Sequence, residues 1–140
     1  PFIVSWPGTI QHKVSPALVS QIDLLASFAS YFKFKIPSGD AIDSENHMST
    51  LLGKTNQGRN TYIEHAAGTL AIVNDDWKYI APSNGKAMSG ATNIETGNAA
   101  IPQLYNLKDD IGEKNNLANQ YPEKVAALEL LLKQIKEKNN

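Results

Sequence analysis

The chain has 140 residues, of which 41% are hydrophobic and 8% aromatic, enough for one ordinary domain with a buried core. Its 13 basic and 14 acidic residues give a net charge of -1 without a basic stripe, which excludes the electrostatic signature of a nucleic-acid-binding protein. It has no cysteine, which excludes disulfides and thiol nucleophiles, and no apolar run of about 18 residues that would predict a membrane span.

The first part of the chain predicts one strand and two helices. Phe2-Ile3-Val4 is a short apolar run closed by Trp6-Pro7-Gly8, a pattern typical of a buried strand that ends at a turn. From Asp23 apolar residues recur at helical spacing, which predicts a helix of about ten residues with Asp23 as its N-cap. A short helix around residues 49–52 should end at Gly53.

The second part predicts a small antiparallel sheet. Short strand-like runs separated by turn residues occupy residues 61–66, 69–74 and 77–81, and residues 104–107 can add a fourth strand. Between the third and fourth runs, residues 82–102 form a loop rich in Gly, Ser, Asn, Ala and Thr. A loop of this length is either functional or flexible.

The last segment, residues 122–138, predicts an amphipathic helix. Pro122 suits the first turn, and Glu123 is placed favourably against the helix dipole. One apolar face is formed by Val125, Leu128, Leu131, Leu132 and Ile135. The predicted fold class is α+β: one strand and one helix, then a four-stranded antiparallel sheet packed on a C-terminal helix.

Four segments stand in a distinctive order: residues 1–8 (PFIVSWPG), 19–25 (VSQIDLL), 76–80 (DWKYI) and 104–117 (LYNLKDDIGEKNNL). In this order they resemble the second half of type I sulfatases, the arylsulfatase-like family of the alkaline-phosphatase-like superfamily. The last segment is similar to the family pattern of Leu-Tyr-Asp-Leu, Asp-Pro, Glu and Asn-Leu. It departs from that pattern at Asn106, where the family usually has Asp, and at Ile111, where it usually has Pro.

The resemblance implies the organisation of the chain. Residues 1–55 would be the tail of a catalytic α/β domain, and residues 56–140 a C-terminal subdomain. The partner would be the N-terminal catalytic domain of the same sulfatase, in a periplasmic or secreted enzyme. Because Pro1 directly precedes the predicted strand, we expect the chain to be a piece of a longer protein. Without its neighbours, the strand at Phe2 to Val4 would expose an apolar edge, and we expect self-association or disorder there.

The resemblance also implies chemistry that this chain lacks. Sulfate-ester hydrolysis in the family uses calcium and a formylglycine made from a Cys/Ser-x-Pro-x-Arg motif, which lies upstream of the matched segments. Ser5-Trp6-Pro7-Gly8-Thr9 begins like that motif, but Thr9 replaces the Arg, so a turn is predicted. Asp75-Asp76 and Asp109-Asp110 also fall in predicted turns, where Asp bonds the local backbone. We expect no catalytic residue, metal ligand or cofactor in this chain.

Three residues are candidates for substrate binding. His65 closes a predicted strand, and in similar sulfatases neighbouring segments approach the substrate pocket; an ordinary strand-end histidine is the alternative. Asn84 and Lys86 lie in the long loop, which in the family often reaches the mouth of the active site; a solvated loop is the alternative.

Two functions are therefore open. The first is scaffold and pocket rim of a sulfatase acting on a sulfated carbohydrate or aryl sulfate, with the isolated chain inactive. The second is a non-catalytic ligand- or partner-binding module.

Overall fold

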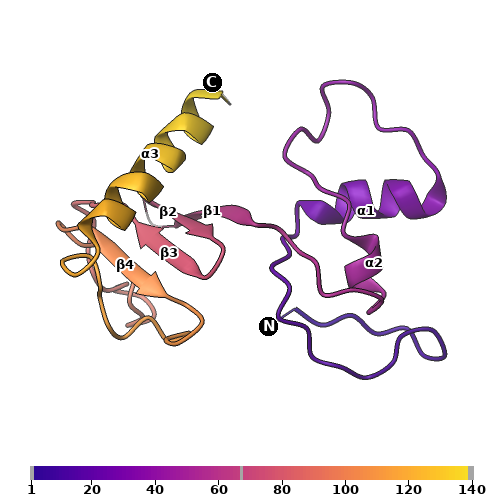
Figure 1. The fold of residues 1–140 in the computed structure, drawn as a ribbon, viewed down its shortest axis with the longest axis horizontal. Coiled ribbons are helices and arrows are strands. Elements are labelled where there is room, and N and C mark those ends of the chain that lie inside the picture. Colours follow the sequence, from indigo (N-terminus) through magenta and orange to yellow (C-terminus); the bar gives the residue numbers. More distant parts are fainter. Residues whose placement is uncertain (1, 67, 139–140) are drawn as a thin grey trace. The chain divides into compact units, whose positions relative to one another are not determined.

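The computed structural model describes residues 2–66 and 68–138. The chain divides into two compact units, Pro1–Arg59 and Asn60–Asn140, called unit 1 and unit 2 below (Figure 1). None of the helices in the described ranges is both long and apolar enough to cross a membrane.

Unit 1 contains two helices, α1 (Asp23–Phe32) and α2 (Met48–Leu51). Helix α1 ends at Lys33, which takes a left-handed conformation while the N–H of Phe34 donates to the carbonyl of Ala29 at 2.8 Å. The predicted role of Asp23 as N-cap is wrong. Ile22 holds the cap position with helical backbone angles and no side-chain bond, and Asp23 is the first helical residue.

Residues 2–6 form no strand, which corrects the prediction for Phe2 to Val4. A strand needs a neighbour for its ladder, and the sheet that the described residues form joins β1 to β4 only. Phe2 and Ile3 are 49% and 84% exposed. The turn that follows is confirmed, because the N–H groups of Thr9 and Ile10 both donate to the carbonyl of Trp6 at 3.0 Å.

A polar lock holds unit 1 together. The guanidinium of Arg59 donates to both carboxylate oxygens of Asp23, through Nε at 2.8 Å and also through Nη2. The same carboxylate accepts the N–H groups of Ser20 and Glu45, at 3.0 and 2.9 Å. These bonds offset burial and keep the pKa of Asp23 below its usual value. Ser27, which is fully buried, accepts the N–H of His47 at 2.9 Å. The polar lock therefore joins Ser27 of α1 to His47, 20 residues later, and Asp23 of α1 to Arg59, 36 residues later.

Unit 2 has the predicted α+β fold, a four-stranded antiparallel sheet that contacts the C-terminal helix. Its strands are β1 (Thr61–Ala66), β2 (Thr69–Asn74), β3 (Trp77–Ile80) and β4 (Gln103–Asn106), antiparallel and in sequence order. Helix α3 (Pro122–Lys138) lies over one face of this sheet. Strand β3 ends one residue earlier than predicted, and β4 begins and ends one residue earlier.

The core of unit 2 lies between the sheet and α3. Ile72, Tyr79 and Leu104 are paired across β2, β3 and β4 and are at most 1% exposed. Leu128 and Leu132 of α3 complete this cluster, with Val125, Leu131 and Ile135 packed beside it. The apolar face predicted for the helix is confirmed. Burying each large side chain contributes roughly 2 kcal/mol, which makes this cluster the main source of stability in unit 2.

The loop between β3 and β4 is folded around Asn98. Asn98 is only 6% exposed, and its side-chain oxygen accepts a hydrogen bond from the Ser83 hydroxyl at 2.6 Å. Its side-chain nitrogen donates to the Thr96 hydroxyl at 3.0 Å and to the Lys86 carbonyl at 3.3 Å. Gly85 passes so close that an added Cβ would lie 2.5 Å from the Asn98 side chain. Asn98 thus gives residues 82–102 a defined conformation without long strands or helices.

Candidate functional site

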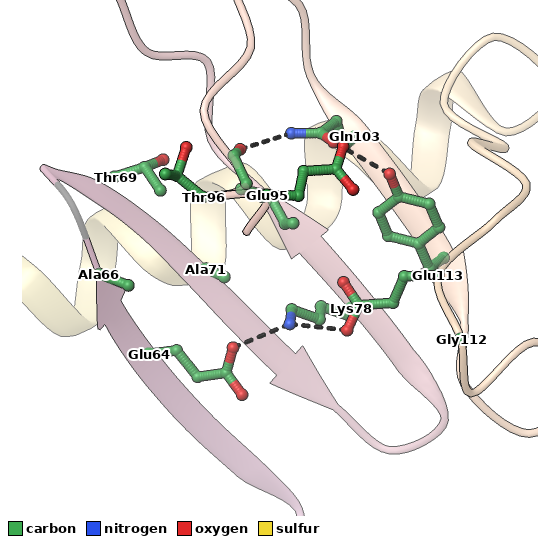
Figure 2. Close-up of a pocket in the computed structure, with 13 residues that line it drawn as sticks. Glu64, Ala66, Thr69, Ala71, Lys78, Glu95, Thr96, Gln103, Gly112 and Glu113 are labelled. Carbon is green, nitrogen blue, oxygen red and sulfur yellow. Dashed lines mark hydrogen bonds and ion pairs between the residues drawn. The ribbon is translucent and has the colours of Figure 1, made fainter. Parts of the chain in front are cut away.

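A cavity of about 320 Å³ lies on the sheet face opposite α3 (Figure 2). Side chains alternate between the faces of a strand, so residues next to the core positions point into this cavity. Glu64 of β1, Lys78 of β3 and Tyr105 of β4 do so. The wall is completed from loops by Glu95, Thr96, Gly97, Gly112 and Glu113.

Lys78 is the central charged group of the cavity. Its ammonium lies 2.9 Å from a carboxylate oxygen of Glu64 and 2.8 Å from one of Glu113 (Figure 2). Burial acts to lower the pKa of Lys78, but the bonds and charges of Glu113 and Glu64 outweigh it and hold that pKa above its usual value. The ion pairs also tie the loop after β4 to the centre of the sheet.

Gln103 and Tyr105 form a second polar chain in the cavity. The Tyr105 hydroxyl donates to Oε1 of Gln103 at 2.9 Å, and Nε2 of Gln103 donates to the carbonyl of Gly97 at 2.8 Å. Burial raises the pKa of the Tyr105 hydroxyl, and the charges of Glu113 and Glu95 add to this effect. The hydroxyl stays protonated at neutral pH and acts as a fixed hydrogen-bonding group.

The charges determine what the cavity can hold. Three carboxylates, of Glu64, Glu95 and Glu113, face one ammonium, of Lys78, so an anionic sulfate would be repelled. Hydroxyl and amide groups can bond to Gln103 and to the free carboxylate oxygens. Across residues 2–66 and 68–138 no three His, Cys, Asp or Glu side chains are grouped to hold a metal ion.

The three predicted substrate-binding residues lie outside the cavity. His65 is exposed and follows Glu64 on β1, so its side chain leaves the sheet on the face that carries the core. Asn84 and Lys86 are exposed in the loop, where bonds to the Lys86 carbonyl fix the backbone. Their contact with substrate stays a prediction.

The cluster of Glu64, Lys78 and Glu113 was not predicted from the sequence. Lys78 and Glu113 both lie in segments that carry the family resemblance, and strand alternation places Glu64 and Lys78 on one face. These features could have predicted that Glu64 and Lys78 lie together on the sheet. The position of Glu113 could not be predicted in this way, because it depends on the conformation of a loop.

The paired aspartates occupy turns, as predicted. Asp75 takes a positive φ of 51° between β2 and β3. Asp110 accepts the backbone N–H groups of Lys114 and Asn115, both at 2.8 Å. Local backbone bonding accounts for Asp110, while Asp109 accepts a hydrogen bond from the side-chain amide of Asn106 at 2.8 Å.

Comparison with known proteins adds a close match. The N-acetylgalactosamine-6-O-sulfatase of Bacteroides thetaiotaomicron is 45% identical over 137 residues, which are 97% of this chain and 27% of the relative. A solved chain from a B. thetaiotaomicron system for the metabolism of multiple glycosaminoglycans is 43% identical with a TM-score of 0.85, over 94% of this chain and 28% of that one. The chain corresponds to the C-terminal portion of sulfatases.

More distant sulfatases share the fold of this portion. A 2-O GAG sulfatase is 20% identical with a TM-score of 0.55, over 83% of this chain and 24% of its own. No protein-family model matches the chain. The chain spans little more than a quarter of the length of these two B. thetaiotaomicron proteins, so the activity of a whole sulfatase concerns a longer polypeptide than this one.

Proposed function

We propose that this chain is the C-terminal part of an enzyme that hydrolyses sulfate esters of carbohydrates, in which it supplies scaffold and part of the rim of the substrate site. The observation that carries the proposal is the 45% identity over 97% of the chain to an N-acetylgalactosamine-6-O-sulfatase. That relative indicates a sugar with a 6-O-sulfate as the substrate class. Calcium and formylglycine belong to the preceding part of the enzyme, which performs the chemistry.

The rim role falls to exposed residues of unit 2. Lys86 offers an ammonium to an anionic sugar from a loop whose backbone is fixed by Thr96 and Asn98. Asn84, two residues earlier, offers an amide to sugar hydroxyls, and His65 offers an imidazole from the end of β1. The acidic cavity suits uncharged parts of a sugar rather than its sulfate.

A chimera tests this proposal. This chain should replace the matched 137 residues of the B. thetaiotaomicron sulfatase, and sulfate release from 6-O-sulfated N-acetylgalactosamine should be measured. We expect turnover by the chimera. We expect none from the isolated chain with calcium and a chromogenic aryl sulfate. A folded chimera without turnover, or turnover by the chain alone, would contradict the proposal and favour a non-catalytic binding module.

The rim assignment has its own variants. In the chimera, Lys86→Met should lower kcat/KM about tenfold, as expected for the loss of a hydrogen bond to a charged group that contributes roughly 1.5 kcal/mol. Lys133→Met, on the exposed side of α3, is the matched control and should leave kcat/KM unchanged. Asn84→Ala and His65→Ala should have smaller effects, mainly on KM. Equal kinetics for the Lys86 and Lys133 variants would remove Lys86 from the rim.

A further inference from the structure

The loop between β3 and β4 contains the only Asn-Gly dipeptide of the sequence, Asn84-Gly85. Asparagine is a thermolabile residue, because its side-chain amide can be attacked by the backbone nitrogen of the residue that follows. Glycine in the following position favours this attack, since it has no side chain to obstruct the approach and its backbone rotates freely. The dipeptide is therefore a candidate site of spontaneous covalent modification.

The structure leaves both reacting groups accessible. Asn84 and Gly85 are exposed and lie outside every helix and strand of the described ranges. Within residues 2–66 and 68–138, the Asn84 side chain makes no hydrogen bond and the N–H of Gly85 donates none. Asn98 of the same loop is the opposite case, because it is buried and its amide donates to Thr96 and Lys86.

The packing of the loop requires the glycine. A Cβ at position 85 would lie 2.5 Å from the side chain of Asn98, which is too close for any other residue type to fit without a shift. The residue that makes Asn84 reactive is thus the one that the fold of this loop needs. The loop cannot remove the reactive dipeptide by exchanging Gly85, so the reactivity of Asn84 is built into it.

The reaction balances with water as the only co-reactant. The backbone nitrogen of Gly85 forms a bond to Cγ of Asn84, the Cγ–Nδ2 bond breaks, and the proton from Gly85 leaves with the side-chain nitrogen as ammonia. Water then opens the resulting cyclic succinimide at one of its two carbonyl carbons. Opening at Cγ gives aspartate, and opening at the backbone carbon gives isoaspartate, in which the main chain runs through the former side chain. Either product carries a carboxylate where the amide was neutral.

We propose that Asn84 deamidates spontaneously in the folded protein and that this conversion weakens the binding of sulfated substrate as the protein ages. The effect on substrate rests on the proposed function, because it takes Asn84 and Lys86 as part of the rim. A carboxylate two residues from Lys86 repels an anionic sugar. Isoaspartate also lengthens the main chain between Ser83 and Lys86, which hydrogen bonds to Ala99 and Thr96 hold in place. Lys86 must then move.

Peptide mapping by mass spectrometry tests the chemical step. Trypsin cleaves after Lys78 and Lys86 and releases residues 79–86, in which Asn84 is the only asparagine. The chain is aged in mildly alkaline buffer, folded or in urea, and digested in mildly acidic buffer, which suppresses deamidation during digestion. We expect the peptide from the folded chain to gain the mass of an amide-to-acid conversion and to separate into aspartate and isoaspartate forms.

Asn93 is the internal control for this measurement. It is exposed in the same loop but precedes Ile94, whose branched side chain obstructs the attack. Asn84 should convert at least about tenfold faster than Asn93. In the Asn84→Gln variant, residues 79–86 should keep their mass, because glutamine would have to form a larger ring. An Asn84 that converts only in urea, or no faster than Asn93, would overturn the proposal.

The consequence for substrate is measured in the chimera, with each variant compared before and after ageing. The kcat/KM for sulfate release should fall as the converted fraction of residues 79–86 rises. Asn84→Asp should lower kcat/KM about threefold, as expected for repulsion between two exposed charges a few ångströms apart. Asn84→Gln should keep the kcat/KM with which it starts, whereas Asn93→Gln, the matched control, should lose activity like the parent. Equal losses in the Asn84→Gln and parent chimeras would contradict the effect on substrate.

The two readouts separate this proposal from the proposed function. Sulfate release tests the function, whereas the mass of residues 79–86 is measured without it. An inactive chimera in which Asn84 converts would sink the function and support the deamidation. An active chimera in which Asn84 stays intact would do the reverse.

Discussion

Unit 1 buries the carboxylate of Asp23 and the hydroxyl of Ser27, whereas unit 2 buries Ile72, Tyr79 and Leu104. Burial of the apolar cluster stabilises the folded state of unit 2, because apolar surface is removed from water. The polar lock of unit 1 replaces hydrogen bonds to water by hydrogen bonds within the protein. It therefore fixes the geometry of unit 1 but adds little net stability. Unit 2 therefore has what a domain needs to fold alone, and unit 1 has a defined shape without a core of its own.

The two tryptophans allow each unit to be followed separately. Trp6 lies in unit 1 beside Tyr31, and Trp77 lies in unit 2 with Tyr121 5.4 Å away between ring centroids. Because the chain has two tryptophans, Trp77→Phe leaves a reporter of unit 1 and Trp6→Phe a reporter of unit 2.

The largest expected effect is the loss of Asp23. Asp23→Ala leaves the Arg59 guanidinium, whose side chain is 8% exposed, without its main partner and should destabilise unit 1 by about 4 kcal/mol. Urea unfolding followed by Trp6 should lose its transition, while the Trp77 transition stays. Asp40→Ala, at an exposed turn, is the control. If both tryptophans report the same loss, the two units are not independent.

A cavity in the core of unit 2 should cost somewhat less. Leu104→Ala removes a fully buried side chain between the sheet and α3 and should lower the free energy of unfolding of unit 2 by about 3 kcal/mol. Leu25→Ala, at a position 57% exposed on α1, should change the isolated chain by less than about 0.5 kcal/mol. Urea midpoints measure both. A larger loss from Leu25→Ala would show that unit 1 has a core of its own.

The units should also differ in the pH at which they lose stability. The pKa of Asp23 is depressed in the fold, so its contribution is present above the ordinary value of 3.8 and is lost as the pH falls below it. In unit 2, burial raises the pKa of Tyr79 and of Tyr105, and the pKa of Lys78 is raised as well. Their contributions are present below ordinary values of 10.0 to 10.5 and are lost as the pH rises through the folded values.

The fluorescence of the remaining tryptophan, measured as a function of pH in the Trp77→Phe and Trp6→Phe variants, tests this difference between the units. The Trp6 signal should change first in acid, and the Trp77 signal should change first in alkali. Asp23→Ala should abolish the acid step of unit 1. An acid step that survives this substitution would come from another carboxylate.

The smallest expected effect concerns the cavity. Lys78→Met leaves Glu64 and Glu113 facing each other without a cation, but both carboxylates are about a third exposed, so water screens them. We expect a loss of about 1 kcal/mol in unit 2, seen by Trp77, and none in unit 1. The double variant Glu64→Gln with Lys78→Met should recover part of it. No loss from Lys78→Met would mean that the cluster serves another purpose than stability.

Much of unit 2 could be predicted from local pattern. The alternation of β1 to β3 and the apolar stripe of α3 are properties of neighbouring residues. Helix α3 begins and ends at the predicted residues. The candidate site could not be predicted in the same way. Glu113 follows Lys78 by 35 residues, and the cavity exists only where a loop returns to the sheet.

The sequence by itself determined the α+β fold class, the order of strands, the terminal helix and the resemblance to sulfatases, because short-range periodicity and ordered motifs carry these features. Only the tertiary structure decided the role of Asp23, which depends on Arg59 36 residues later. It also decided the state of Phe2 to Val4, since an apolar run becomes a strand only beside another strand. Pairing between distant residues is the physical reason in both cases, and local sequence does not encode it.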